Sequence, residues 1–253
     1  TGEALALTLE EKQQILNLAI SLNLQVPLMV GVGGINIEDT KKWVQYLETI
    51  KVDCYLMVTP LYSKPGKWGQ KNWFETLMNE AHRPCMLYNI PGRSACTLNL
   101  ESCRELQQHP QFWAIKEAGG TIESFQNYRL SLPHISIFSG DDALLPNFSL
   151  YGAKGLISVS ANIWPEETRQ YVKLCLAGQG AETWPLWEIA SNSLFSASNP
   201  IPVKALLCQQ GLIKTQAVRA PLDHQDLPSL APLQEAHGQI SDWWAKFQTK
   251  DNE

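Results

Sequence analysis

A single lysine closes a short apolar run, and this placement favours chemistry that starts from an uncharged amine. Lys116 follows the apolar residues 113–115, a run typical of a strand buried on both faces. Burial disfavours the charged form of a lysine and lowers its pKa toward that of a nucleophilic amine, which can form a Schiff base with a carbonyl compound. In the alternative interpretation, the side chain reaches the rim or pairs with Glu117.

Two further residues could assist such an amine. Tyr88 ends another apolar run and lies 28 residues before Lys116, about one strand and helix unit away, so the two side chains could meet at the same end of neighbouring strands. Its phenol could relay protons, although a half-buried aromatic residue is the simpler interpretation. Arg93 lies in a glycine-flanked loop and could hold a substrate carboxylate in a bidentate pair. A surface arginine is the alternative.

Other chemistries have less support. The five histidines are scattered without metal-ligand spacing, so we expect no metal site. No G-x-S-x-G motif and no P-loop occur, and the glycines at 31, 33 and 34 lack the third glycine of a dinucleotide-binding loop. Ser139-Gly140-Asp141-Asp142 is more typical of a helix cap than of a metal site. A lysine-centred mechanism remains.

Strand and helix patterns alternate along the chain and must position these residues. Short apolar runs followed by Gly, Pro, Asn or Asp predict six strands: Pro27 to Val32, Cys54 to Thr59, Cys85 to Asn89, Trp113 to Lys116, Ile135 to Ser139 and Gly155 to Val159. Helical periodicity predicts helices over residues 8–22, 37–50, 70–81, 100–108, 121–130, 143–151, 165–177, 184–195, 202–210 and 233–247. Thr8 and Glu11 form a capping box at the first of them.

This alternation predicts an α/β fold, either an open doubly wound sheet or a closed (β/α)8 TIM barrel. Without a dinucleotide motif we favour the barrel, with its first two strands absent from the N-terminal end of this sequence. We expect residues 1–180 to form the barrel and residues 181–253 a C-terminal helical domain. The active site of such a barrel lies where the strands end.

Composition and charge limit which partners and which cellular compartment the protein can have. The 20 basic and 25 acidic residues give a net charge of −5 without a basic block, so we expect no nucleic-acid partner. No apolar run approaches the roughly 20 residues of a membrane span, and no signal peptide opens the chain. The six cysteines form no C-x-x-C pair, which favours a reducing compartment. We therefore expect a soluble, cytoplasmic protein.

Five segments carry a resemblance to a known family. They are Thr59-Pro60-Leu61-Tyr62, Tyr88-Asn89-Ile90-Pro91-Gly92-Arg93-Ser94, Ile115-Lys116-Glu117-Ala118, Ser139-Gly140-Asp141-Asp142 and Asn199-Pro200-Ile201-Pro202-Val203-Lys204. In type, order and spacing they resemble the dihydrodipicolinate synthase family, which belongs to the pyruvate-dependent class I aldolases of the N-acetylneuraminate lyase superfamily. The resemblance extends over nearly the whole chain.

The resemblance implies a role for each candidate residue. Lys116 would form an imine with pyruvate, and no external cofactor would be needed. Tyr88 would shuttle protons, and Thr1 would link Tyr88 to Tyr62 through hydroxyl hydrogen bonds. Arg93 would bind the carboxylate of the second substrate, L-aspartate 4-semialdehyde.

The resemblance also implies a wider site and an assembly. Gly140 and the backbone carbonyl of Ile157 would border the pyruvate pocket. In this family the tyrosine at the position of Tyr62 reaches into the site of a neighbouring subunit, which implies a homo-oligomer, expected to be a tetramer. Leu61, Leu9 and Lys12 stand where feedback-regulated members bind lysine, so weak or absent inhibition by L-lysine is expected.

Three functions stay open at this point. The first is the lysine-pathway synthase, which Arg93 between Gly92 and Ser94 favours. The second is a class I sugar-acid lyase acting on N-acetylneuraminate or 2-keto-3-deoxygluconate, a type that usually carries small or apolar residues at this position. The third is a catalytically silent homologue that binds a keto acid.

Overall fold

A computed structural model describes residues 1–250 as two compact units. The first, here called the sheet unit, contains Leu7–Gly140 and Tyr151–Lys154. The second, here called the helical unit, contains Thr1–Ala6, Asp141–Leu150 and the described residues from Gly155 onward. The predicted domain boundary at residue 180 stays a prediction.

The sheet unit is built on five parallel strands. They are β1 (Met29–Val32), β2 (Cys54–Val58), β3 (Cys85–Asn89), β4 (Phe112–Glu117) and β5 (Ser136–Ser139). Their order in the sheet is the same as their order along the chain. In a doubly wound sheet the order in which strands are added reverses at a switch point. In a barrel each new strand is added next to the previous one, always on the same side. The consecutive order therefore favours the barrel, as the sequence predicts.

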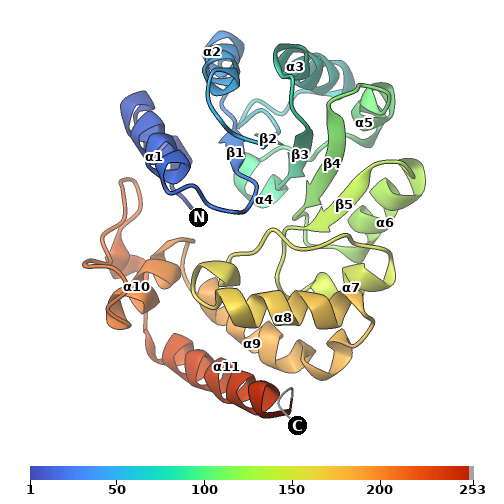
Figure 1. Ribbon diagram of the computed structural model, residues 1–253. Coiled ribbons are helices and arrows are strands. Elements are labelled where there is room, and N and C mark those ends of the chain that lie inside the picture. Colours follow the sequence, from blue (N-terminus) through green and yellow to red (C-terminus); the bar gives the residue numbers. More distant parts are fainter. Residues whose placement is uncertain (251–253) are drawn as a thin grey trace. The chain divides into compact units, whose positions relative to one another are not determined.

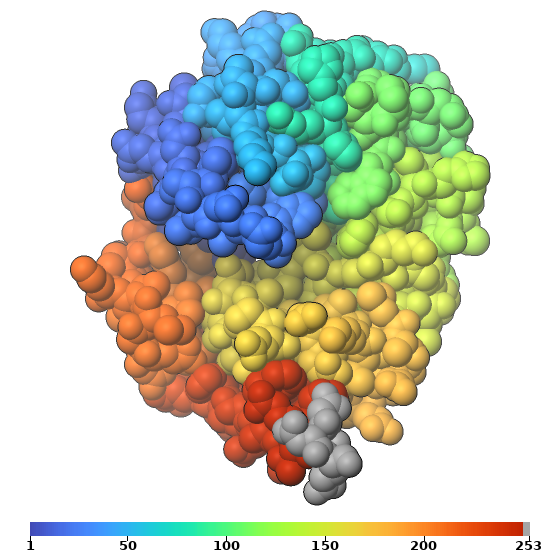
Figure 2. All heavy atoms as spheres, viewed as in Figure 1, coloured from blue at the N-terminus to red at the C-terminus, as the bar shows by residue number. Residues whose placement is uncertain are grey.

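Helices alternate with these strands along the chain, and Figure 1 shows α2, α3 and α5 grouped along one side of the sheet. The helices of this unit are α1 (Leu9–Ser21), α2 (Ile37–Glu48), α3 (Lys67–Glu80), α4 (Pro91–Ser94), α5 (Leu100–Leu106) and α6 (Ile122–Ser131). In Figure 2, α1 and α2, coloured blue, lie at the surface. Buried apolar side chains of the strands and of α2 and α3, such as Val44, Leu47, Phe74 and Leu87, form the core between helices and sheet.

Side-chain caps fix where the first helices begin. The predicted capping box is confirmed, because the Thr8 backbone N–H donates to Glu11 Oε2 at 2.9 Å and the Glu11 N–H donates to Thr8 Oγ1 at 3.2 Å. At α2, Asn36 Oδ1 accepts from the N–H groups of Glu38 and Asp39. Such caps satisfy donors that the first turn of a helix leaves unpaired.

The helical unit contains α7 (Leu145–Leu150), α8 (Pro165–Leu176), α9 (Trp184–Leu194), α10 (Ile201–Gln209) and α11 (Ala231–Lys250). Short 3₁₀ turns lie at Ala4–Ala6, Ser160–Asn162, Gly180–Glu182 and His224–Asp226. Its core is aromatic: the rings of Tyr171 and Trp187 stack with centroids 4.3 Å apart, and Trp164 meets Trp187 edge to face. Aromatic pairs of this kind bury large areas.

The sixth predicted strand, Gly155 to Val159, is wrong in extent, because only Leu156 forms a bridge. The cause is a side chain from an earlier part of the chain. Asp142, which is 1% exposed, accepts hydrogen bonds from the backbone N–H groups of Val159 at 3.0 Å and Ser160 at 3.3 Å. These donors therefore serve a side chain instead of a sheet ladder, and a 3₁₀ turn follows at once.

Candidate active site

Lys116 and Tyr88 meet at the carboxyl ends of adjacent strands, as their spacing predicts. The two residues are direct partners in the register of β3 and β4. The Lys116 Nζ lies 4.1 Å from the centroid of the Tyr88 ring. Both side chains are half-buried. An amine and a phenol are thus placed together where parallel α/β folds build their sites.

An irregularity in β4 sets this register. Cys85 pairs with Phe112, but the next residue, Met86, pairs with Ala114, so Trp113 is passed over. Without this shift Tyr88 would pair with Ile115. A bulge of one residue moves every later side chain of a strand to the opposite face relative to its partner strand. The bulge therefore places Lys116, and not its buried neighbour, opposite Tyr88.

Gly140, the residue after β5, provides the space that the lysine side chain occupies. A Cβ atom at this position would lie 2.7 Å from Lys116 Cε and 2.8 Å from Ala118 Cβ. Its N–H donates to the Glu117 carbonyl at 2.7 Å, which holds the end of β5 against the end of β4. The structure thus brings Gly140 together with Lys116, at a position where no larger residue fits without movement.

We predict that Gly140→Ala lowers the rate of imine formation by Lys116 about 10- to 100-fold, because the new methyl group must displace the lysine side chain, and a shift of about 1 Å can cost that much. The measurement is the rate of borohydride-trapped adduct formation with pyruvate. Gly178→Ala, at a positive-φ turn after α8 with open space around it, is the control for a general loss of stability. An unchanged trapping rate in Gly140→Ala would contradict this assignment.

Tyr62, on the loop after β2, and Arg93, in the short helix α4, lie in two connected segments of the sheet unit. The Tyr62 N–H donates to the Ser94 carbonyl at 2.9 Å, and Thr59 Oγ1, at the end of β2, donates to Ser94 Oγ at 3.0 Å. Arg93 lies in the short helix α4, where the sequence predicts a loop, and its side chain is exposed. Tyr62 has a positive φ of 68° and is 88% exposed. A phenol this exposed fits the prediction that it serves a neighbouring subunit.

Thr1 and Ile157 belong to the helical unit. Asn199, in the Asn-Pro-Ile-Pro segment, donates from Nδ2 to Thr1 Oγ1 at 2.8 Å. Ile157 directly precedes Ser158, whose hydroxyl donates to the buried Asp142 carboxylate. Each residue therefore has a defined place within its own unit. Their roles toward pyruvate stay predictions.

A buried polar pair that was not predicted from the sequence lies at the same strand ends, on the face away from the candidate site. Asn89 and Glu117 follow Tyr88 and Lys116 in the chain, and both are fully buried. Asn89 Nδ2 donates to both carboxylate oxygens of Glu117, at 3.1 and 2.8 Å. In the sequence, the signal for such a pair is two polar residues at the ends of neighbouring apolar runs, where pairing of Glu117 with Lys116 is the simpler interpretation.

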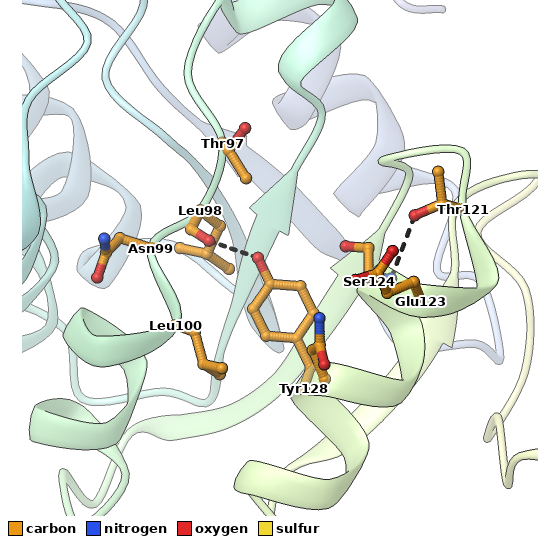
Figure 3. Close-up of a pocket in the computed structure, with 9 residues that line it drawn as sticks. Thr97, Leu98, Asn99, Leu100, Thr121, Glu123, Ser124 and Tyr128 are labelled. Atoms are coloured by element: carbon orange, nitrogen blue, oxygen red, sulfur yellow. Dashed lines mark hydrogen bonds between the residues drawn. The ribbon is translucent and has the colours of Figure 1, made fainter.

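A pocket of about 360 Å³ opens in the sheet unit between the loop before α5 and the start of α6. Figure 3 shows its lining, in which the Tyr128 hydroxyl donates to the Leu98 carbonyl at 2.5 Å. The lining residues are Thr97, Leu98, Asn99, Leu100, Thr121, Glu123, Ser124, Asn127 and Tyr128. None of the predicted site residues lines it. The strand ends, and not this pocket, carry the candidate chemistry.

Comparison with known proteins decides the family. A model of the dihydrodipicolinate synthetase family matches residues 1–236. The chain belongs to this family. A 4-hydroxy-tetrahydrodipicolinate synthase of Francisella philomiragia is 47% identical over 246 residues, which are 97% of this chain and 83% of the relative. A synthase of the same name from Wolbachia pipientis subsp. Culex pipiens is 43% identical over 96% of this chain and 83% of its own length.

Solved structures of the same family agree. The 4-hydroxy-tetrahydrodipicolinate synthase of Methylacidiphilum fumariolicum SolV superposes with a TM-score of 0.89 at 29% identity, covering 98% of this chain and 84% of that one. A chloride-inhibited dihydrodipicolinate synthase of Acinetobacter baumannii, complexed with pyruvate, gives 0.88 at 30% identity, covering 95% and 84%. The predicted fold class, a (β/α)8 barrel with C-terminal helices, is confirmed by this likeness. The expectation that two strands precede Thr1 stays a prediction.

Proposed function

We propose that this chain is a lyase, a 4-hydroxy-tetrahydrodipicolinate synthase, which condenses pyruvate with L-aspartate 4-semialdehyde in the biosynthesis of diaminopimelate and lysine. Relatives of that name at 43–47% identity support the activity. The observation that carries the chemistry is the placement of the Lys116 amine 4.1 Å from the Tyr88 ring, in the space that Gly140 leaves.

The first half of the reaction is imine formation. The lone pair of Lys116 Nζ attacks the ketone carbon of pyruvate, a C–N bond forms, and the ketone oxygen leaves as water after taking up protons. We propose that Tyr88 delivers and removes those protons. The resulting iminium withdraws electrons, so the pyruvate methyl group loses a proton and an enamine forms.

The second half makes the carbon–carbon bond. The enamine carbon attacks the aldehyde carbon of the semialdehyde, and the aldehyde oxygen takes up a proton. The amino group of the second substrate then attacks the iminium carbon and displaces Lys116 Nζ. The ring closes and the lysine is regenerated, so the cycle needs no external redox partner. We propose on this basis that the covalent imine takes the place of a cofactor.

Arg93 is proposed to bind the carboxylate of the semialdehyde, so Arg93→Ala should raise KM for that substrate about 10- to 100-fold, which corresponds to the roughly 1.5–3 kcal/mol of a charge-assisted hydrogen bond. Pyruvate trapping by borohydride should stay within about twofold of the wild type. Arg169→Ala, on α8 and exposed like Arg93, is a matched control for loss of an arginine. Equal loss of condensation and of trapping would argue against this role for Arg93.

A substrate panel separates the proposed synthase from the alternatives. We expect condensation with L-aspartate 4-semialdehyde, and no cleavage of N-acetylneuraminate or 2-keto-3-deoxygluconate at comparable rates. Cleavage of either sugar acid faster than condensation would identify a sugar-acid lyase. Binding of pyruvate without borohydride trapping would identify a catalytically silent homologue.

The cellular location, the assembly and the partners of the enzyme are also proposals. Within residues 1–250 no helix has the length and apolar character to cross a membrane. The same residues contain no cluster of three or more His, Cys, Asp or Glu side chains arranged to hold a metal ion. The cytoplasmic location, the homotetramer and the absence of a metal, of nucleic-acid partners and of lysine inhibition stay predictions.

A further inference from the structure

The strand ends behind the proposed site are joined by polar side chains where an apolar core is the norm. Side chains alternate between the two faces of a strand, so Asn89 and Glu117 point away from the side on which Tyr88 and Lys116 meet. Both are 0% exposed. Burying an amide and a carboxyl group costs free energy unless their hydrogen bonds are satisfied, so the pair must be stabilised by its surroundings.

The Glu117 carboxylate is surrounded by donors. Asn89 Nδ2 donates to both of its oxygens at 3.1 and 2.8 Å, and the Gly119 N–H donates to Oε1 at 2.5 Å. A Cβ at Gly119 would lie 2.5 Å from that same oxygen, so the close approach requires glycine. The Ser124 hydroxyl, at the start of α6, also hydrogen-bonds to this group. Burial raises the pKa of Glu117, while these hydrogen bonds from Asn89, Gly119 and Ser124 lower it and only partly offset the burial.

The Asn89 amide uses its other end to hold a loop. Its Oδ1 accepts from the Leu98 N–H at 2.8 Å, and the Leu98 carbonyl accepts from the Tyr128 hydroxyl, as Figure 3 shows. Burial raises the pKa of Tyr128, so its hydroxyl remains a donor near neutral pH. The loop that follows Arg93 is thereby attached to the end of β3 through one side chain.

The backbone at this point joins three strand ends. The Ala118 N–H donates to the Asn89 carbonyl at 2.9 Å, and the Gly140 N–H donates to the Glu117 carbonyl at 2.7 Å. Asn89 and Glu117 are also direct partners in the register of β3 and β4. Their side chains therefore stabilise this register one residue after Tyr88 and Lys116, which the bulge at Trp113 makes partners.

We infer that Asn89 and Glu117 are positioning residues, whose buried side-chain pair holds the ends of β3 and β4 in the one register that keeps the Tyr88 phenol beside the Lys116 amine. The inference rests on the proposed function, because it concerns the rate at which that amine forms its imine. Neither residue touches the reacting atoms. Each acts through the strand that carries its catalytic neighbour.

An exchange of donor and acceptor across the pair tests this inference. Asn89→Asp alone places a second carboxyl group next to that of Glu117, and the hydrogen bonds between the two side chains are lost. Glu117→Gln alone turns an NH2 group toward either Asn89 Nδ2 or the Gly119 N–H, so one hydrogen bond is lost. The double variant restores the pattern, since the amide at 117 can donate to the carboxylate at 89 and still accept from Gly119. It also keeps the net charge of the wild type.

The measurements are the rate of imine formation at saturating pyruvate, by borohydride quench, together with KM for pyruvate and the unfolding temperature. We expect each single variant to form the imine about 10- to 100-fold more slowly per folded molecule, as for a misplacement of about 1 Å. The double variant should return to within about threefold of the wild type, which is strong coupling between the two positions. Asn79→Asp, an exposed change on α3, should have no effect.

The outcomes distinguish the inference from the proposed function. Single variants that unfold at lower temperature but form the imine at the wild-type rate would overturn the positioning role and leave the function intact. A double variant as slow as the slower single variant would overturn it as well. A wild-type protein that traps no pyruvate would overturn the proposed function and the inference together.

Discussion

Lys116→Ala is expected to lower kcat/KM for condensation by about 1,000-fold or more, because no other group in the reaction scheme can form the imine. The side chain lies in a half-buried position against Tyr88, at the end of a strand, so its truncation leaves only a small space there. Folding should therefore be preserved. The measurement is steady-state condensation together with the unfolding temperature.

Lys42→Ala is the matched control for this prediction. Lys42 lies on α2, its side chain is 76% exposed, and its Nζ lies 4.0 Å from Asp39 Oδ1. An exposed ion pair of this kind contributes little to stability, so the control should retain wild-type kcat/KM. Residual activity above about one tenth in Lys116→Ala would mean that another amine carries the reaction.

Tyr88→Phe is expected to lower kcat about 100- to 1,000-fold, within the range typical of a lost general acid or base. The ring is kept, so its contact with Lys116 and its packing in β3 are kept too. Only the hydroxyl is removed. Both imine formation and condensation should slow, because protons move in both halves of the reaction.

The pH profile of kcat/KM checks this second prediction, since loss of the phenol should remove or shift one of its limbs. Tyr151→Phe, at a residue 41% exposed, controls for the loss of a hydroxyl elsewhere in the sheet unit. A Tyr88→Phe variant with wild-type rates across the whole pH range would show that water or another group handles the protons.

Local patterns in the sequence predicted the elements well. Apolar runs located all five strands of the sheet within a residue or two, and Thr8 with Glu11 predicted the first cap correctly. These features depend on neighbours in the chain, which the sequence displays. The sixth strand failed because the Asp142 carboxylate, 17 and 18 residues before Val159 and Ser160, accepts hydrogen bonds from their backbone N–H groups at the end of that segment.

The pairing of Lys116 with Tyr88 was predicted from their spacing, but its cause was not. The spacing indicates that two residues lie near the ends of neighbouring parallel strands. It does not reveal that a bulge passes over Trp113, without which Ile115 would be the partner of Tyr88. A register shift of one residue depends on packing between strands, and the sequence pattern does not display it.

The space at Gly140 and the pair of Asn89 with Glu117 could not be predicted for the same reason. Glycine after a strand is typical of any turn, and only the folded structure shows that a Cβ there would lie 2.7 Å from Lys116 Cε. The hydrogen bonds of Glu117 depend on which side-chain atoms of two strands face each other. The sequence shows residue types at strand ends and not those contacts.

The central claim is that the Lys116 amine forms a covalent imine with pyruvate. The most direct test is to incubate the wild-type protein with pyruvate, reduce it with borohydride, and map the modified peptide by mass spectrometry. We predict one pyruvate-derived adduct per chain, attached to Lys116 and absent without pyruvate. No adduct, or an adduct attached only to another lysine, would contradict the account.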